Sequence, residues 1–323
     1  MNRPGAIVIG DAAVDTRIQL PDKDVGVGTL KDIRPDLSPG GTVGNTAVAL
    51  ARIGVKVGLV FAVGADGYGD YLKQALSAAG VDIHHVQVVP GRFTLNVIVI
   101  IDQSGERYFA VHPADGAASL YYPPAALDLD SLRAAGWLHV SGSGFEHGTT
   151  RHTVLKAMAW AKESGVPVSL DLNLRPQTDS LSPDYQETVD RALHYADYVL
   201  GSATDEFTLY TGLADGIEAA RLVAAGQRTV VARLGHEGCL VITPAGTTEH
   251  IPAFTVPVVD TLGAGDVFNA GFIAAGLAGQ SVFAAARWGN ALAALSVAAA
   301  GAAQHLTPEG FATMLGTGPN DKS

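Results

Sequence analysis

One stretch limits what this chain can fold into more than any other, residues 258–268, Val-Val-Asp-Thr-Leu-Gly-Ala-Gly-Asp-Val-Phe. The alternating residues 254–259 predict a strand that leads into it, and the apolar, small-residue run 267–277 predicts a helix that follows it. Two glycines therefore form a turn between a strand and a helix, where backbone N–H groups have no helical partner. Such a turn predicts an anion site at the helix N-terminus, with Asp266 beside it.

The residue types of this turn fit phosphoryl transfer. A carboxylate at Asp266 suits a general base that takes the proton from an attacking hydroxyl. The backbone amides of Gly263, Ala264 and Gly265 would then hold the charge of the phosphoryl group. On the stretch alone a second interpretation is equally open, in which Asp266 is a helix N-cap and the glycines form a tight turn.

Composition excludes several classes of function. A net charge of −11 argues against nucleic acid or an anionic membrane as the main partner, so any phosphate must be held locally by amides and a metal ion. A single cysteine, Cys239, excludes an intrachain disulfide and a cysteine-rich metal site, and it fits a reducing cytoplasm. No signal-peptide core or membrane span is apparent, because the apolar residues 284–303 contain Arg287 and Asn290. We therefore expect a cytoplasmic protein.

Strand-like and helix-like segments alternate along most of the chain. This order predicts an α/β fold, a mostly parallel sheet with helices on both faces. Segments 16–36 and 93–111 break the alternation, the second as a β-hairpin around residues 102–106. The expected strands are 6–10, 57–63, 137–140, 166–170, 198–200 and 229–233, and the expected helices are 42–53, 68–79, 150–164, 185–195 and 217–225.

Residues 260–266, Asp-Thr-Leu-Gly-Ala-Gly-Asp, resemble the D-T-x-G-A-G-D signature of the ribokinase-like (PfkB) family of sugar and nucleoside kinases. The resemblance covers roughly residues 6–315. It implies one three-layer α/β/α kinase domain over residues 1–315, followed by a tail at 316–323. It also implies that segments 16–36 and 93–111 form a β lid over the sugar and the contact of a homodimer.

The resemblance places a sugar site near the N-terminus. Polyols need carboxylate and amide partners, and a Gly-Gly turn lets a sugar ring approach the backbone. Asp15 and Asn45 would contact the sugar, although both residue types also cap turns and helices. The other implied sugar contacts are Gly40, Gly41, Asn96 in the lid hairpin, and Arg175, which follows the D-x-N-x-R-P pattern of fructokinase-like and ketodeoxygluconate-kinase-like members. Arg175 would offset phosphate charge or pair with a substrate carboxylate.

The nucleotide and metal sites follow from the same resemblance. Glu206 aligns with a glutamate that orients magnesium through water, with Asp205 as the competing candidate, and Ala203 stands where the family has asparagine. Asp260, with carbonyls near Leu262, is the expected site of a monovalent cation such as potassium. The implied nucleotide contacts are Thr261, Gly235, Gly238 and Asn290.

These residues predict an ATP- and magnesium-dependent kinase that phosphorylates a hydroxyl group of a small sugar or sugar acid. A nucleoside kinase is the first alternative, but the lid region has few aromatic residues to stack a purine, which argues against it. A catalytically silent sugar- or nucleotide-binding regulator is the second, since Ala203 departs from the family pattern. A nicotinamide-dependent dehydrogenase is a third and weaker alternative, because Gly142-Ser143-Gly144 lacks the spacing of a dinucleotide motif.

Overall fold

The computed structural model describes residues 5–20, 33–102, 104, 106–113, 115–145, 147–176 and 180–316. Much of the expected lid segment 16–36, at residues 21–32, and residues 317–323 of the expected tail lie outside this range.

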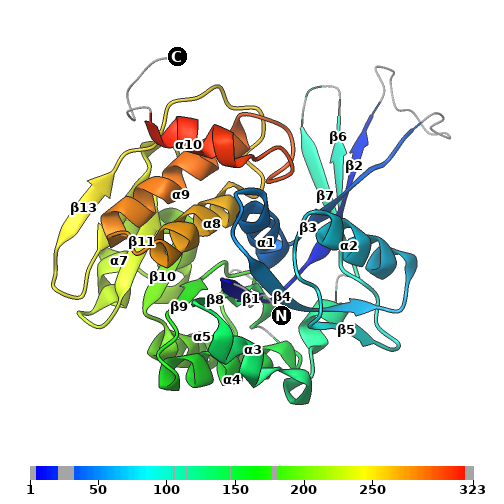
Figure 1. The fold of residues 1–323 in the computed structure, drawn as a ribbon, viewed down its shortest axis with the longest axis horizontal. Coiled ribbons are helices and arrows are strands. Elements are labelled where there is room, and N and C mark those ends of the chain that lie inside the picture. Colours follow the sequence, from blue (N-terminus) through cyan, green and yellow to red (C-terminus); the bar gives the residue numbers. More distant parts are fainter. Residues whose placement is uncertain are drawn as a thin grey trace.

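A large sheet forms the centre of the molecule (Figure 1). Its strand order is β13-β12-β11-β10-β9-β8-β1-β4-β5, parallel throughout except for the antiparallel pairs β11–β12 and β12–β13. Because β1 pairs with β4 on one side and β8 on the other, the chain reverses its direction across the sheet at β1. Ligands of open α/β sheets bind at such a reversal. Within the described residues the strands are β1 (Ala6–Ile9), β4 (Val57–Gly64), β5 (Val86–Val89), β8 (Trp137–Ser141), β9 (Val168–Asp171), β10 (Tyr198–Ser202), β11 (Thr229–Arg233), β12 (Cys239–Ile242) and β13 (Thr248–Ile251).

Helices cover both faces of this sheet, as the alternation predicted. Side chains of β1 show why, because Ala6 and Val8 join one buried cluster and Ile7 and Ile9 join the other. One layer holds α1 (Thr42–Arg52), α2 (Gly67–Ala78), α8 (Ala264–Leu277), α9 (Val282–Val297) and α10 (Pro308–Gly316). The other holds α3 (Leu129–Ala134), α4 (Thr150–Glu163), α5 (Pro183–Tyr195), α6 (Thr208–Thr211) and α7 (Gly216–Ala224).

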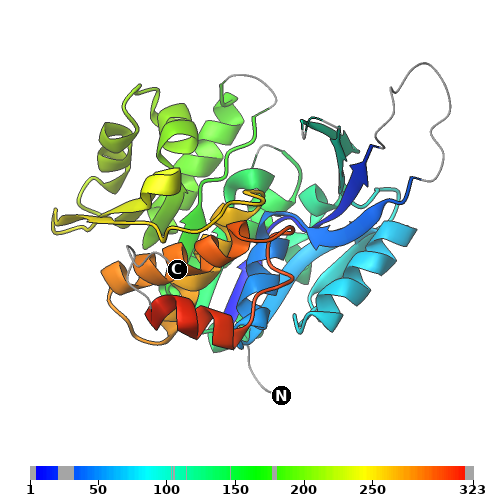
Figure 2. The ribbon, with the colours of Figure 1, turned by 90° about the horizontal axis from the view of Figure 1, so that it is seen from above.

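A small second sheet projects from one end of the molecule (Figures 1 and 2). Its order is β3 (Asp36–Gly40), β2 (Ala13–Gln19), β6 (Asn96–Ile101) and β7 (Arg107–His112). β6 and β7 pair antiparallel, which confirms the expected hairpin, and β2 pairs parallel with β6. The two segments that break the alternation therefore form one sheet, separate from the central one.

One expected strand is absent. Residues 254–259 form no strand, although their alternation predicted one before the glycine turn. The sheet already ends at β13, and the N–H groups of Val259 and Asp260 instead donate to the carbonyl of Val297, at 2.7 and 3.2 Å. The segment crosses from the sheet edge to the end of α9, and its alternating apolar side chains do not reflect strand pairing.

Candidate active site

A cleft of about 750 Å³ lies at the carboxyl ends of the central strands, beneath the small sheet. Polar residues reach it from the ends of β1, β8, β9, β10 and β11 and from the first turns of α1 and α8. Asp15 reaches it from β2 of the small sheet. The residues that line the cleft include Asp11, Asp15, Gly41, Thr42, Asn45, Ser143, Asp171, Asn173, Arg175, Ser202, Asp205, Glu206, Arg233, Thr261, Gly263, Ala264, Gly265 and Asp266. This is the crevice that the strand order predicts for a ligand.

The glycine turn opens α8 toward this cleft. Gly263 has φ 76° and is the N-cap, and no side chain caps the helix. A Cβ on Gly263 would lie 2.5 Å from that of Ala302, so the close packing requires glycine. No capping side chain therefore competes with an anion for the first-turn N–H groups, of which that of Ala264 also donates to the Thr261 carbonyl at 3.3 Å. The interpretation of Asp266 as the N-cap is wrong, because Gly263 occupies that position.

Asp266 is held by α1. The Asn45 side-chain amide donates to its carboxylate at 2.9 Å, and the Thr46 hydroxyl donates to its backbone carbonyl at 3.0 Å. Burial raises the pKa of Asp266 well above its usual range; the Asn45 hydrogen bond opposes this, and the negative charges of Asp171 and Asp11 add to it. A carboxylate with a raised pKa is the stronger base near neutral pH.

A buried arginine connects α8 to the strand ends. The Arg233 guanidinium donates to both carboxylate oxygens of Asp171, at 3.1 and 2.8 Å, and to Glu206 at 3.3 Å. It also donates to the Gly265 carbonyl at 3.2 Å, which ties the first turn of α8 to β11. The Asn269 amide adds a bond to Asp171 at 2.6 Å. Burial disfavours the charged form of Arg233, but the two carboxylates raise its pKa. The network therefore fixes the anion turn relative to the sheet.

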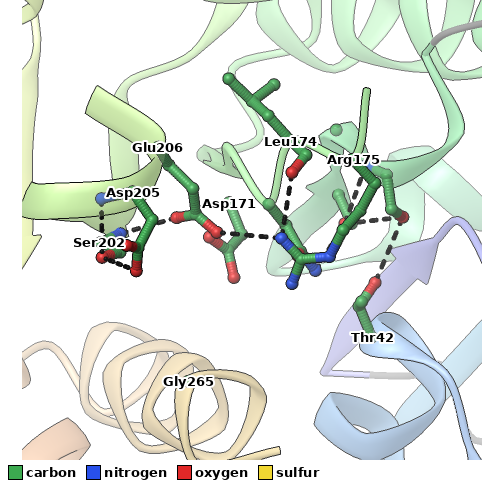
Figure 3. A network of polar contacts seen from close by, with 12 residues as sticks. Thr42, Asp171, Leu174, Arg175, Ser202, Asp205, Glu206 and Gly265 are labelled. Carbon is green, nitrogen blue, oxygen red and sulfur yellow. Dashed lines mark hydrogen bonds and ion pairs between the residues drawn. The ribbon is translucent and has the colours of Figure 1, made fainter. Parts of the chain in front are cut away.

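Glu206 and Arg175 form the outer part of this network (Figure 3). Glu206, 5% exposed, accepts from the Ser202 N–H at 2.6 Å, and its other oxygen lies 3.7 Å from Arg175. Burial and the charge of Asp171 raise the pKa of Glu206, against the effect of Arg233. Asp205 is exposed and accepts from the Ser202 hydroxyl at 2.7 Å. Ala203 is buried and lines neither this cleft nor the adjoining cavity described below.

Carboxylates dominate the end of the cleft that lies beneath the small sheet. Asp11 accepts from the Thr42 hydroxyl at 2.5 Å and from Ser143 at 2.7 Å. Burial and, to a smaller extent, the charge of Asp11 together raise the pKa of Asp15 to about 7. Beside them, the buried Asn173 has an unusual φ of 33° and a side-chain oxygen without a hydrogen-bond partner. Strained backbone and unsatisfied polar atoms of this kind gather at ligand sites.

The two predicted glycines of the sugar site have different surroundings. Gly41 has φ 81° and lines the cleft, where a Cβ would lie 2.7 Å from Cα of Ala12. Gly40 does not line the cleft, but a Cβ there would lie within 2.4 Å of both carboxylate oxygens of Asp15. Gly40 therefore leaves room for the Asp15 side chain.

Asn96 is not brought to the cleft. It is 1% exposed and donates to the Thr16 hydroxyl at 2.8 Å. Its neighbour Val97 lines the cleft, and successive side chains of a strand point to opposite faces. Asn96 therefore lies on the face of the small sheet that is turned away from the cleft.

A second cavity of about 470 Å³ continues from the cleft along α8 and α9. The residues predicted to contact the nucleotide, Thr261, Gly235, Gly238 and Asn290, all line it. The Asn290 amide donates to the carbonyls of Ile251 and Pro252, at 2.9 and 3.1 Å, so it also ties α9 to the end of β13. Both cavities share the exposed Thr261 and the first turn of α8, and a ligand can therefore span the two.

Asp260 lies outside both of these cavities, on a smaller one. It is 7% exposed, and its carboxylate accepts from the Leu262 N–H at 3.1 Å. The guanidinium of Arg17 on β2 lies 3.7 Å from it. At the position expected to bind a monovalent cation, the structure places a positively charged side chain.

Sequence reasoning did not select several residues that line this site or support those that do. Asp171 and Asn173 lie in the quoted D-x-N-x-R-P pattern, which pointed to Arg175 alone. Arg233 directly precedes the glycine hairpin, but an arginine at a strand end carries no signal by itself. Asn269, three residues after Asp266, has the helical spacing that could have found it.

Comparisons with known proteins agree with this geometry of the site. A model of the pfkB family carbohydrate kinase matches residues 5–309. The chain belongs to the PfkB family. It is 34% identical to a fructokinase of Klebsiella pneumoniae over 278 residues, covering 85% of each chain. It is 28% identical to a 5-dehydro-2-deoxygluconokinase of Listeria monocytogenes over 268 residues, covering 80% of each.

A solved structure matches over nearly the whole chain. The aminoimidazole riboside kinase from Salmonella enterica, complexed with aminoimidazole riboside and an ATP analog, superposes with a TM-score of 0.80 at 27% identity, covering 96% of this chain and 99% of that one. These findings confirm the PfkB resemblance, the ribokinase-like three-layer fold with its small second sheet, and an ATP-dependent sugar kinase. A kinase family excludes the dehydrogenase alternative.

Among the described residues, no helix is both long and apolar enough to cross a membrane.

Proposed function

We propose that this PfkB kinase transfers the γ-phosphoryl group of ATP to a hydroxyl group of a neutral sugar bound in the cleft. The observation that carries the proposal is the position of Asp266. Its carboxylate lies on the first turn of a helix without a side-chain cap, where the two cavities meet. A sugar hydroxyl in one cavity and the terminal phosphate of a nucleotide in the other can meet there.

The proposed step needs no covalent intermediate on the protein. Asp266 accepts the proton of the sugar hydroxyl as its oxygen bonds to the γ-phosphorus. The bond between that phosphorus and the β–γ bridging oxygen breaks, and ADP leaves with the electron pair. The N–H groups of Gly263, Ala264 and Gly265 hold the charge that develops on the phosphoryl oxygens.

The side chains of this site would not hold a magnesium ion by themselves. They suit one whose ligands are mainly phosphate oxygens and water. The described residues contain no group of three or more histidine, cysteine or acidic side chains that could hold a metal. Asp205 is exposed and borders both cavities, whereas Glu206 already accepts from Arg233 and Ser202. Asp205 and Glu206 would therefore hold its water ligands, and the ion would offset charge on the phosphates.

Charge in the cleft favours a neutral sugar over a sugar acid. Among the described residues, seven carboxylates line it, against two arginines and one histidine. Arg233 is fully engaged by Asp171 and Glu206, and Arg175 lies beside Glu206. A substrate carboxylate would meet Asp11 and Asp15 without a dedicated cation, whereas sugar hydroxyls can donate to both.

A nucleoside kinase remains the second candidate. Phe109 of β7 lines the cleft and is 57% exposed, so its ring is available to stack on a base. The apolar surface that sequence reasoning did not find in the lid is thus provided by at least one side chain.

ADP release with ATP, magnesium and a sugar panel tests the proposal. The panel contains neutral sugars, sugar acids and ribosides. We expect saturable ADP release with at least one neutral sugar and none with the acids. Turnover of sugar acids alone would contradict the neutral substrate, ribosides alone would favour the nucleoside kinase, and no turnover with any compound would favour the silent regulator. Arg175→Gln is the matched variant, because it raises the KM only of an acid that depends on Arg175.

We also propose that the small sheet is the lid of this cleft and the contact of a homodimer. Val97, Phe109 and Val111 of the sheet line the cleft, so its closure would exclude water, which competes with the sugar for the phosphoryl group. The opposite face carries Tyr108, which is 52% exposed, and the partly buried Ile98 and Ile100. A second copy would cover these apolar side chains.

Two measurements test the lid and the dimer. We expect a dimer by sedimentation at micromolar concentration, and a monomer there contradicts it. Val97→Asp should raise the ratio of ATP hydrolysis to sugar phosphorylation, and an unchanged ratio contradicts the lid. A cytoplasmic location, where ATP is abundant, is part of the same proposal.

A further inference from the structure

Arg17 connects the small sheet to the anion turn. Its guanidinium, on β2, lies 3.7 Å from the carboxylate of Asp260. Among the ion pairs within the described residues, this one links the small sheet to the segment that leads into α8. Asp260 is 7% exposed and Arg17 is 39% exposed, so the carboxylate is the desolvated member of the pair. A nearby positive charge strongly stabilises the ionised form of a buried carboxylate, because it offsets the loss of hydration.

Asp260 in turn shapes the backbone that precedes α8. Its carboxylate accepts from the Leu262 N–H at 3.1 Å. The backbone carbonyl of the following residue, Thr261, accepts from the Ala264 N–H at 3.3 Å. These two bonds lead directly into Gly263, the N-cap of α8. A shift of the Asp260 carboxylate would therefore reorient the N–H groups that face the cleft.

The pair borders the sugar and base machinery as well. Arg17 and Asp260 line a small cavity of about 50 Å³ together with Asp15, Asn45 and Leu262. Asn45 donates to Asp266, and Asp15 lines both this small cavity and the cleft. One compact region thus joins the small sheet, the anion turn and the residue that holds the proposed base.

We propose that Arg17 is a positioning residue that holds Asp260, and through it the anion turn, in the geometry for phosphoryl transfer. Because Arg17 is part of β2, this geometry depends on where the small sheet lies. The protein itself supplies the positive charge at Asp260, so activation by potassium is expected where Arg17 has been removed. The inference rests on the proposed kinase function.

The test compares Arg17→Ala, Arg17→Lys and the control Arg191→Met, at an exposed arginine of α5. We expect Arg17→Ala to lower kcat by about 10- to 100-fold, the range that misplacement of reacting groups by about 1 Å produces, with a smaller change in the sugar KM. Guanidinium chloride, well below denaturing concentrations, and potassium should restore part of this loss. Arg17→Lys should retain more activity than Arg17→Ala, and Arg191→Met should match the wild type.

Binding of a non-hydrolysable ATP analogue with magnesium, measured by calorimetry, examines the turn without turnover. We expect Arg17→Ala to weaken it at least about fivefold, the lower limit of typical coupling between sites. An unchanged kcat and analogue affinity overturn the inference, as does a loss that neither lysine nor guanidinium relieves. A wild-type protein that phosphorylates no sugar would refute the kinase proposal alone, because the analogue still reports on Arg17.

Discussion

Arg233→Met is the substitution whose effect on stability can be worked most fully from the structure. The methionine replaces the apolar stem of the side chain and removes five hydrogen bonds to Asp171, Glu206, Gly265 and Asn269. The side chains of Asp171 and Glu206, 2% and 7% exposed, then lose the cation that offsets their burial. Removing one partner of a buried ion pair costs about 3–5 kcal/mol. At about 2 °C per kcal/mol for a large domain, the melting temperature should fall by about 6–10 °C.

The pH dependence of this loss gives a second, independent check. The folded-state pKa of Glu206 is raised by burial and Asp171, and Arg233 opposes that rise. Without Arg233 the pKa rises further, so the folded protein binds a proton more readily than the unfolded chain. The free energy of unfolding of the variant therefore falls as the pH rises, and its deficit relative to wild type should be larger at pH 8 than at pH 5.

Urea unfolding followed by tryptophan fluorescence at both pH values measures these differences. Arg191→Met, at an exposed arginine of α5, is the control and should change the free energy of unfolding by less than about 0.5 kcal/mol. In an Asp171→Asn background, Arg233→Met should cost less, because one of the stranded charges is gone. A loss below about 1 kcal/mol at pH 8, or an equal loss at both pH values, would refute the proposed role of Arg233 as counter-charge.

Two further predictions use other parts of the site. Burial raises the pKa of Asp15 to about 7 from 3.8, so between these pH values the folded protein holds a proton that the unfolded chain has lost, and the wild-type free energy of unfolding falls as the pH rises. Asp15→Asn lacks this proton and should therefore gain stability relative to wild type in thermal scans as the pH rises from 4 to 8. A constant difference would contradict this. Gly238→Ala would place a Cβ 2.1 Å from the carbonyl oxygen of Ile251, whereas the Cβ of Gly246→Ala, also at positive φ (83°), meets no atom within 4 Å. Gly238→Ala should therefore raise the KM for ATP well above that of Gly246→Ala. Equal effects would show that the hairpin does not shape the nucleotide cavity.

Local patterns in the sequence predicted the elements and the anion turn, because both depend on neighbouring residues. Gly263 and Gly265 signal a helix start through their missing side chains, and the alternation of strands and helices fixes the layers. The same reasoning failed at residues 254–259, where alternation of apolar residues has no paired strand behind it. The sheet edge that decides this is a property of the whole fold.

Side-chain placement was harder to predict. In β6 both faces carry apolar residues, so the pattern of 96–101 could not show that Asn96 points away from the cleft; the register with β2 decides it. The network of Asp171, Arg233 and Asn269 joins residues up to 98 positions apart, and no local spacing reports such contacts. Long-range pairing, rather than composition, assembles this part of the site.

The central claim is that Asp266 is the base, and Asp266→Asn tests it most directly. Asparagine is nearly isosteric and its side-chain oxygen can still accept from Asn45, so the fold and the cleft should persist. A positioned general base contributes about 100- to 10,000-fold to the rate. Steady-state ADP release should therefore fall at least about 100-fold, while the sugar affinity by calorimetry stays within several-fold. A variant that keeps more than about a tenth of wild-type turnover would show that Asp266 is not the base.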